Sequence, residues 1–406
     1  MENFIKKPVV VLKGPFLTSS GYGVHSRQIA KYFIEKSVNG EIELHIRPLP
    51  WGICPWILNK DEYNGLINQI MICSTYFDGQ FDLSVQVQLP NEWEPNLAKY
   101  NVGITAACET DKCNPEWITC CNKMNSVIVP SKHSKNNLEF YKENLTTKIS
   151  IIPESFPDIF NSDNLNKNDL INLDTNFNFL VVGQLTGQNV ANDRKNIFNT
   201  LKWLCEIFKD NKDIGIVIKT NSGTNSKIDR QNVTNLLHAL IKEIRPNISY
   251  PKIYLLHGLL KDEEMLKIYK HSKIKSLICA SRGEGFGLPL LEAAACGLPV
   301  IATNWSGYLD FMNLGKFIKL NYSLETIHSS RVDQNIFMKD SKWAEVSSED
   351  FKTKIKKFYE SSLIPKEWAI ELSRIIKEKY SFKAISNIYD TFFNPLIENL
   401  INRDST

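Results

Sequence analysis

A glycine-rich turn between an apolar strand and a helix, at residues 281–302, constrains the fold of this chain more than any other stretch. The apolar residues 276–280 that precede it have the character of a short buried strand. Three glycines then allow a tight turn and leave backbone N–H groups uncovered by side chains. Pro289 suits the first turn of a helix, and Gly297 with Pro299 ends that helix. A strand, a glycine turn and a helix N-terminus in this order are typical of anion-binding sites.

Two acidic residues, Glu284 and Glu292, bracket this turn. An anion site needs no carboxylates of its own, so we expect both to bind hydroxyl groups of the same ligand. A phosphate flanked by sugar hydroxyls describes a nucleotide sugar. The alternative for Glu292 is a first-turn acid that balances the helix dipole, but that interpretation leaves Glu284 unexplained.

The length of 406 residues predicts two domains, because single cores rarely grow beyond about 250–300 residues. Strand and helix patterns alternate on both sides of a stretch rich in Pro, Asn, Asp and Ser. The predicted fold class is α/β, with two doubly wound, Rossmann-like domains that face each other across a cleft. The predicted domains are residues 1–160 on the acceptor side and residues 179–380 on the nucleotide-sugar side, joined by a linker at 161–178. Residues 381–406 are predicted to form a C-terminal helix, which could pack back on the first domain.

The expected elements follow from apolar periodicity and turn residues. Strands are predicted near residues 8–14, 41–47, 81–88, 102–107, 126–129, 179–182, 214–219, 252–256, 276–279, 300–302 and 317–319. Helices are predicted near residues 24–36, 131–141, 196–209, 229–243, 262–271 and 289–296, and residues 347–406 are helical in character.

The charge balance is nearly even, with 48 basic and 45 acidic residues. This composition does not indicate a binder of nucleic acid or other polyanions. No apolar run reaches the roughly 18 residues of a membrane span, and the N-terminus leads straight into a strand. We therefore expect a cytoplasmic protein that is at most peripheral to a membrane.

The chain has nine cysteines, and an odd number without a signal peptide favours reduced thiols. Four of them, Cys108, Cys113, Cys120 and Cys121, lie close together in the sequence but lack the paired C-x-x-C spacing of structural zinc sites. We expect ordinary packing rather than metal binding there. No metal site and no cofactor are predicted anywhere in the chain.

Other candidate ligand contacts follow predicted strands. Gly21 and Gly23 lie in the turn after the first strand, where a ligand loop and a plain tight turn are both consistent with the sequence. Glu109 follows the strand at 102–107, at the sheet edge where ligands bind, and a substrate-facing role is one of its two interpretations. Arg194 and Lys195, two adjacent cations at a helix start, fit a diphosphate clamp.

His25 and Arg27 open the predicted helix after the first strand, and we expect both on a solvated face.

Residues 284–292, with the sequence Glu-Gly-Phe-Gly-Leu-Pro-Leu-Leu-Glu, match the E-x7-E signature of the family 4 retaining glycosyltransferases, which have the GT-B fold. The continuation at 293–303, the run at 193–197 and residues 343–345 are also similar to that family. The resemblance covers residues 179–351 well. It is looser in the N-terminal half, where it depends on the turn at 21–23 and on residues 129–131.

The resemblance implies a nucleoside diphosphate sugar as the donor, held mainly by the C-terminal domain. It assigns the hydroxyls of the transferred sugar to Glu284 and those of the ribose to Glu292, with Arg194 and Lys195 on the diphosphate. Backbone amides of four residues in the turn would meet the sugar or the diphosphate: Gly285, Phe286, Gly287 and Leu288. Membership implies retention of the anomeric configuration by front-side attack, with neither a protein nucleophile nor a metal ion required.

Two positions depart from the pattern of the family. Gln184 stands where many members carry an arginine, so part of the cationic clamp is missing or is supplied by Arg194. Glu109 stands where many members place a histidine near the acceptor, and we predict that it takes over that role.

The acceptor is open: a polysaccharide or lipid-linked glycan is the first expectation, with a protein or a nucleic-acid base as alternatives. Two rival functions are a GT-B sugar phosphorylase or epimerase, and a sugar-nucleotide-binding protein without turnover.

Overall fold

The computed structural model describes residues 7–162, 170–185, 189–245, 249 and 251–403 of the chain. Its contacts divide the chain into two units. Unit 1 comprises Met1–Ala107, Cys113–Ser155 and Phe382–Thr406, and unit 2 comprises Cys108–Lys112 and Phe156–Ser381. Part of the predicted linker, residues 163–169, lies outside the described residues.

Unit 1 is built on a parallel sheet of six strands in the order β2-β1-β3-β4-β5-β6. The strands are β1 (Val9–Gly14), β2 (Glu43–Pro48), β3 (Phe81–Val87), β4 (Ala98–Ile104), β5 (Ser126–Val129) and β6 (Ile149–Ile151). Strands β1 and β3 are buried along their whole length, as expected for a parallel sheet with helices on both faces.

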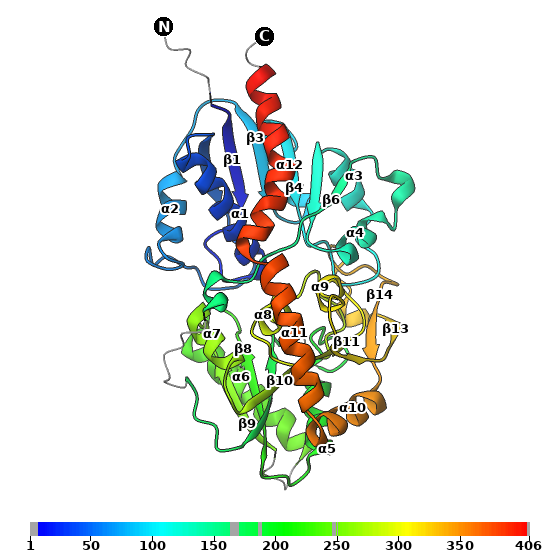
Figure 1. Ribbon diagram of the computed structural model, residues 1–406. Coiled ribbons are helices and arrows are strands. Elements are labelled where there is room, and N and C mark those ends of the chain that lie inside the picture. The colour runs from blue at the N-terminus through cyan, green and yellow to red at the C-terminus, as the bar shows by residue number, and fades with distance from the viewer. Residues whose placement is uncertain (1–6, 163–169, 186–188, 246–248, 250, 404–406) are drawn as a thin grey trace. The chain divides into compact units, whose positions relative to one another are not determined.

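The helices of unit 1 come from both ends of its sequence. They are α1 (Gly21–Val38), α2 (Leu66–Cys73), α3 (Glu116–Asn122), α4 (Lys132–Glu139) and α12 (Phe382–Arg403), with short 3-10 turns η1 (Pro90–Glu92) and η2 (Lys142–Asn144). Helix α12 is drawn in red in Figure 1. Its aromatic residues pack on those of α1. The ring centroids of Phe33 and Phe393 are 4.9 Å apart, and those of Tyr32 and Tyr389 are 5.2 Å apart.

Unit 2 contains a second parallel sheet of six strands, in the order β12-β11-β10-β7-β8-β9. The strands are β7 (Phe177–Val182), β8 (Ile214–Thr220), β9 (Lys252–His257), β10 (Ile274–Cys279), β11 (Val300–Thr303) and β12 (Ile318–Leu320). The order reverses between β7 and β10, so their carboxyl ends form the topological switch point where such sheets bind ligands.

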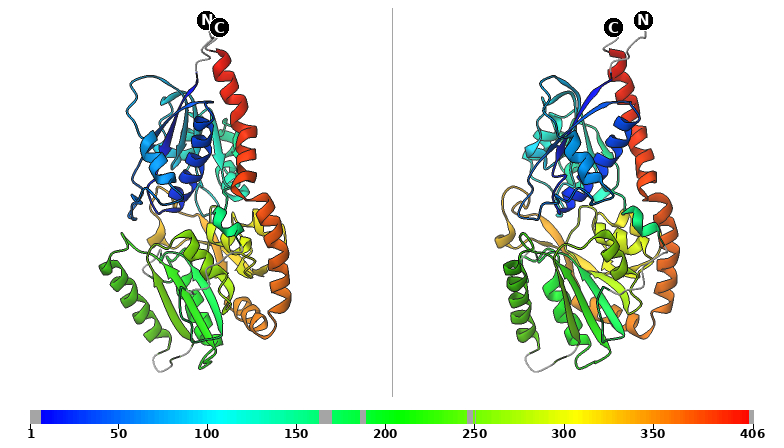
Figure 2. Two further views of the ribbon diagram at one scale, coloured as in Figure 1. Left: turned by 60° about the vertical axis from the view of Figure 1, so that its left-hand side comes forward. Right: turned by 90° about the vertical axis from the view of Figure 1, so that its left-hand side faces the viewer.

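Helices cover both faces of this second sheet. They are α5 (Ile197–Ile207), α6 (Lys227–Ile244), α7 (Asp262–Tyr269), α8 (Leu288–Ala295), α9 (Leu309–Met312), α10 (Ser348–Glu360) and α11 (Leu363–Lys379). Figure 2 shows α6 on one side of the sheet and α11 on the other. The core on the α5, α6 and α10 side is rich in large side chains, among them Phe179, Trp203 and Phe358. Two 3-10 turns, η3 (Asp158–Asn161) and η4 (Ser329–Arg331), complete the unit.

Both units are thus doubly wound α/β domains, which confirms the predicted fold class. Every predicted strand and helix has a counterpart, and most of their ends are shifted. The predicted strand at 102–107 ends early, at Ile104, and Ala107 has a φ of 55° that turns the chain out of the sheet. Elements that were not predicted include α2, the short β6 and an antiparallel hairpin of β13 (Tyr322–Thr326) and β14 (Lys342–Val346).

The predicted solvated position of His25 and Arg27 is wrong, because both side chains are buried. Arg27 donates to the carbonyl oxygens of Phe16 and Thr18, at 3.0 and 2.6 Å, and thereby holds the turn after β1. Burial lowers the pKa of His25 to about 4. Within the described part of the chain, no helix is long and apolar enough to span a membrane.

Candidate active site

The candidate site is formed by two loops of unit 2 that follow β7 and β10 at the switch point. Two contacts lock the loops together. The Asn196 side chain donates to the carbonyl oxygen of Ala280 at 3.1 Å, and the backbone N–H of Arg282 donates to the carbonyl oxygen of Arg194 at 2.8 Å. The loop after β7 therefore holds its cations against the glycine turn.

Local capping fixes the position of these cations. Asp193 is fully buried, and its carboxylate accepts from the backbone N–H groups of Ile197 and Phe198 at 2.6 and 3.2 Å. These are the first residues of α5, so Asp193 satisfies donors that the helix leaves unpaired. Asn196 takes a left-handed conformation with a φ of 55°, which sets the direction of the chain just before the helix.

Glu284 is at the centre of the site and pairs with both predicted clamp residues. Its carboxylate lies 2.6 and 2.8 Å from Nζ of Lys195 and 3.4 Å from Nη1 of Arg194. The same Nη1 donates to the carbonyl oxygen of Gly283 at 2.6 Å. The structure thus brings together Glu284, Arg194 and Lys195, as the sequence predicts.

The electrostatics of this cluster fix its charge state. Burial alone would raise the pKa of Glu284, but the adjacent Lys195 and Arg194 outweigh burial and lower the pKa to about 2. Burial would likewise lower the pKa of Arg194, and the carboxylates of Glu109 and Glu284 raise it instead. Glu284 and Arg194 are therefore both ionised at neutral pH.

Glu109 joins the same cluster, because residues 108–112 belong to unit 2. Its Oε1 lies 3.2 Å from Nη2 of Arg194. A close approach of backbones makes this possible: a Cβ at Gly283 would lie 1.9 Å from the carbonyl oxygen of Glu109. Asp111 has a different role, because its carboxylate accepts from the backbone N–H of Lys342 at 2.7 Å and so anchors β14.

The glycine turn is held from behind by the loop after β11. The hydroxyl of Ser306 accepts from the backbone N–H of Glu284 and donates to its carbonyl oxygen. Gly287 has a φ of 98°, and a Cβ there would also crowd Tyr308, so only glycine suits this position. Phe286 is buried against Phe311, whereas Gly285 and Leu288 are partly exposed at the start of α8.

Glu292, one turn into α8, lies in a separate polar cluster at the same sheet edge. The Tyr269 hydroxyl donates to its Oε2 at 2.9 Å. Burial, and then the negative charge of Asp262, raise the pKa of Glu292 to about 8. Burial also lowers the pKa of the nearby Lys219 to about 8, while its ammonium donates to the carbonyl oxygen of Gly258 at 2.7 Å.

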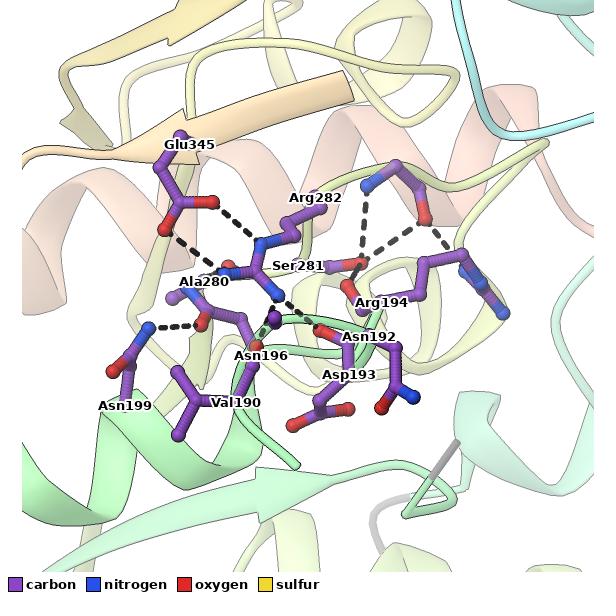
Figure 3. Close-up of polar contacts among 12 residues, drawn as sticks. Val190, Asn192, Asp193, Arg194, Asn196, Asn199, Ala280, Ser281, Arg282 and Glu345 are labelled. Atoms are coloured by element: carbon purple, nitrogen blue, oxygen red, sulfur yellow. Dashed lines mark hydrogen bonds and ion pairs between the residues drawn. The ribbon is translucent and has the colours of Figure 1, made fainter. Parts of the chain in front are cut away.

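Arg282 is a central residue of the site to which the sequence analysis assigned no role. Figure 3 shows its guanidinium between Glu345 of β14 and the loop before α5. It meets the Glu345 carboxylate at 2.7 and 3.0 Å and the carbonyl oxygens of Val190 and Asp193 at 2.7 and 2.8 Å. Two features of the sequence could have pointed to Arg282. It is a basic residue inside a buried motif, and Glu345 lies in one of the stretches that are similar to the family.

Other predicted contacts lie elsewhere. Gly21 and Gly23 are in unit 1, where Ser20 caps α1 by accepting from the backbone N–H of Gly23 at 3.0 Å. A Cβ at Gly23 would lie 2.2 Å from the carbonyl oxygen of Thr18, so local packing explains this glycine. A Cβ at Gly21 would meet nothing within 4 Å. Their donor-binding role stays a prediction.

The cysteines of the predicted packing cluster are divided between the units. Cys108 belongs to unit 2, where its thiol contacts the carbonyl oxygen of Lys112 at 3.2 Å, while Cys113, Cys120 and Cys121 belong to unit 1. Among the described residues, no three His, Cys, Asp or Glu side chains are grouped so that they could hold a metal ion. Gln184, at the departure from the family pattern, is exposed.

The sequence is similar to known glycosyltransferases over part of its length. Residues 250–328 match the family model described as glycosyl transferases group 1. A serotype-specific mannosyltransferase, WbdA of Escherichia coli, is 33% identical over 125 residues, which are 30% of this chain and 13% of that protein. The match thus spans about an eighth of the length of this curated relative.

Solved structures resemble the whole chain in fold. A glycosyltransferase from Rickettsia africae is 15% identical, with a TM-score of 0.64 over 97% of this chain and 100% of that chain. HepE of Anabaena, solved in complex with UDP and glucose, is 12% identical, with a TM-score of 0.61 over 96% of this chain and 100% of that chain. At such low identities the structural likeness establishes the fold alone, and that fold is the GT-B type.

Proposed function

We propose that this chain is a retaining glycosyltransferase of family 4 that moves a sugar from a nucleoside diphosphate sugar to a hydroxyl acceptor. The observation that carries the proposal is the ionised Glu284 between Lys195 and Arg194 at the switch point of unit 2. A carboxylate held among cations beside a glycine turn suits a ligand with both hydroxyl and phosphate groups. The match to glycosyl transferases group 1 supports the same reaction class.

In this proposal Arg194 and Lys195 bind the diphosphate of the donor. Arginine offers a planar fork and lysine a compact charge, and both stabilise the negative charge that grows on the leaving phosphate. In the structure, these cations are paired with carboxylates of the protein. Donor binding would exchange those partners: the diphosphate takes the cations, and Glu284 turns to the hydroxyls of the transferred sugar.

The reaction itself needs little covalent chemistry from the protein. The bond between the anomeric carbon and the phosphate oxygen breaks, a bond to the acceptor oxygen forms on the same face, and the acceptor proton passes to the departing phosphate. The enzyme contributes positioning and charge stabilisation. Retention follows from the resemblance to family 4. Because HepE, which shares the fold, was solved in complex with UDP, nucleoside diphosphates are natural ligands to test.

Glu292 is proposed to accept hydrogen bonds from the ribose hydroxyls. It lies on the first turns of α8, next to Tyr269 and Lys219, at the same sheet edge as the diphosphate residues. An ionised carboxylate offers two acceptor oxygens and no competing O–H, so ribose binding would favour the ionised form of Glu292.

Glu109 is proposed to act toward the acceptor, as a catalytic residue. Its pairing with Arg194 links it to the diphosphate residues, and its side chain remains 24% exposed. A partly exposed carboxylate at this position can accept a hydrogen bond from an incoming hydroxyl. Polysaccharides and lipid-linked glycans are the first acceptors to test.

A donor screen tests the proposed function. Thermal unfolding is measured with UDP-, GDP- and ADP-sugars, including glucosyl and mannosyl donors, because a ligand that binds only the folded state raises the unfolding temperature. The sugar that stabilises the protein is then assayed for donor hydrolysis and transfer. Glu284→Ala should reduce transfer by at least about 100-fold, since it removes interactions with both the sugar and the cations. Stabilisation by none of these donors, or normal turnover in Glu284→Ala, would contradict the proposal.

A further inference from the structure

A rigid turn between β13 and β14 lies directly beside the loop that carries Arg194. The turn has a small apolar core of its own, formed by Ile327, Phe337 and Trp343. Asp333 fixes its tip by accepting from the backbone N–H groups of residues 335, 336 and 337, at 2.8 to 3.0 Å. A turn held in this way positions its side chains firmly.

Several contacts tie this hairpin to the candidate site, besides the pairing of Arg282 with Glu345. The Asn192 side chain donates to the hydroxyl of Ser330 at 3.3 Å, which joins the turn to the loop before α5. The guanidinium of Arg282 lies over the ring of Trp343, 5.1 Å from its centroid. At the other end, the backbone N–H of Asp111 donates to the carbonyl oxygen of Lys342 at 2.9 Å. The residue after Ser330 is therefore placed near Arg194 and Glu109 by fixed backbone.

That residue is Arg331, at the end of η4. Its guanidinium carbon lies 4.1 Å from the centroid of the Phe337 ring, which supports the flat face of the side chain. Its Nε is buried and meets no hydrogen-bond partner among the described residues. A buried donor without a partner costs free energy, unless a ligand or a water molecule satisfies it.

The charges around Arg331 are those of the proposed diphosphate site. Burial lowers its pKa, and the positive charge of Arg194 lowers it further, against the opposing charge of Glu109. The fold therefore keeps two guanidinium groups close enough to repel each other. Arg194 and Lys195 are already paired with Glu109 and Glu284, so Arg331 adds positive charge that an incoming anion can use.

We propose that Arg331 is a third cationic contact to the diphosphate of the nucleotide sugar, in addition to Arg194 and Lys195. This inference rests on the proposed function. The diphosphate of a nucleotide sugar carries about two negative charges. Glu109 and Glu284 already compensate the positive charges of Arg194 and Lys195, so the diphosphate needs a further cation. The planar fork of Arg331 matches phosphate oxygens, and its rigid turn holds the fork in place at little entropic cost. Arg331 would thus distinguish nucleoside diphosphates from monophosphates.

The test compares diphosphate with monophosphate binding by calorimetry. UDP and UMP, GDP and GMP, and ADP and AMP are titrated into the full chain, and inorganic pyrophosphate and phosphate serve as probes without a base. Arg331→Gln should weaken the tightest diphosphate by about tenfold or more and change the matching monophosphate less. Arg331→Lys should restore part of the loss. Lys339→Gln, an exposed cation on the same turn, is the matched control and should leave both affinities unchanged.

The possible outcomes separate this inference from the proposed function. If the wild-type protein binds no nucleoside diphosphate, both fail. If Arg194→Ala weakens diphosphate binding while Arg331→Gln leaves the ratio of diphosphate to monophosphate affinity unchanged, only the role of Arg331 fails. Because this ratio compares two ligands of one variant, a general loss of stability cannot imitate the expected result. A fall in the ratio for Arg331→Gln, partly reversed in Arg331→Lys, supports the inference.

Discussion

Glu284 and Glu292 come from the same short motif, yet the structure gives them opposite proton affinities. Burial opposes ionisation of both carboxyls. For Glu284 the cations Lys195 and Arg194 outweigh burial and lower the pKa to about 2. For Glu292 burial has the largest effect, the negative charge of Asp262 adds to it, and the pKa rises to about 8. Neighbours on other elements therefore decide the charge of each residue.

The raised pKa of Glu292 predicts how the free energy of unfolding changes with pH. The ordinary pKa of the carboxyl is 4.5, so between pH 4.5 and about 8 the folded protein keeps a proton that the unfolded chain has lost. Stability of the wild type should fall with rising pH across this window. Glu292→Gln removes the titration and keeps an oxygen that can accept from Tyr269. Its unfolding temperature relative to the wild type should rise between pH 5 and pH 8, by the equivalent of about 1–4 kcal/mol.

Thermal unfolding at the two pH values measures this difference. Glu263→Gln, an exposed acid at the start of α7, is the control and should show no such change. A difference between Glu292→Gln and wild type that stays the same at both pH values would argue against the raised pKa.

Gly283 gives a second prediction for a single residue. A Cβ there would lie 1.9 Å from the carbonyl oxygen of Glu109, so Gly283→Ala must displace residues 108–112 and weaken the pairing of Glu109 with Arg194. We expect a loss of about 1–3 kcal/mol or more in the free energy of unfolding. Gly21→Ala is the matched control: its Cβ has open space, and the change should stay within about 0.5 kcal/mol. Denaturant unfolding measures both, and equal stabilities would refute the close contact.

At the scale of elements, an ion pair strengthens the attachment of the β13–β14 hairpin to the loops of the candidate site. Arg282 is 4% exposed and Glu345 is 33% exposed, and they meet in a bidentate geometry. Removing one partner of such a pair leaves a charge uncompensated. The hairpin therefore depends on an arginine that lies in the glycine turn itself.

Glu345→Gln should lower the free energy of unfolding by about 3 kcal/mol, near the lower end for buried pairs because Glu345 keeps some contact with water. It should also increase hydrogen exchange in β13 and β14. Glu325→Gln, an exposed acid on the same hairpin, should leave both measurements unchanged. Unchanged exchange in Glu345→Gln would mean that the hairpin is held mainly by its apolar core.

The sequence was sufficient for the elements that have a strong local pattern. Strand β10, the glycine turn and α8 were predicted from apolar residues, glycines and Pro289. Glu284 was selected from the motif at 284–292 and Arg194 with Lys195 from the separate run at 193–197, and the structure brings the three together. The hairpin was missed because β13 is largely exposed and carries no clear alternation. The pairing of Arg282 with Glu345 was missed because it joins residues far apart in the chain, and nothing local marks the partner.

At the scale of the whole molecule, the two units are interleaved in the sequence. The chain passes between them four times, after residues 107, 112, 155 and 381. The short segment Cys108–Lys112 brings Glu109 to unit 2, and α12 returns to complete unit 1. Neither unit is therefore a continuous piece of the chain.

The contribution of α12 to unit 1 can be tested by cavity formation. Phe393 is fully buried and lies against Phe33 of α1. Phe393→Ala should cost about 3–5 kcal/mol. Hydrogen exchange should increase in α1 and α12 while the strands of unit 2 keep their protection. Phe392→Ala removes a neighbouring ring that is only partly buried and should cost less. Equal effects of the two substitutions, or loss of protection confined to unit 2, would contradict this role of α12.

The late position of α12 in the sequence also has a consequence for synthesis on the ribosome. All segments of unit 2 are translated before residue 382. Unit 1 lacks helix α12 until residues 156–381 have been translated. During that interval the surface of α1 that carries Tyr32 and Phe33 lacks its aromatic partners on α12. The nascent unit 1 would therefore expose an aggregation-prone apolar surface while residues 156–381 are translated. We expect the need for a chaperone to be greatest during this stage.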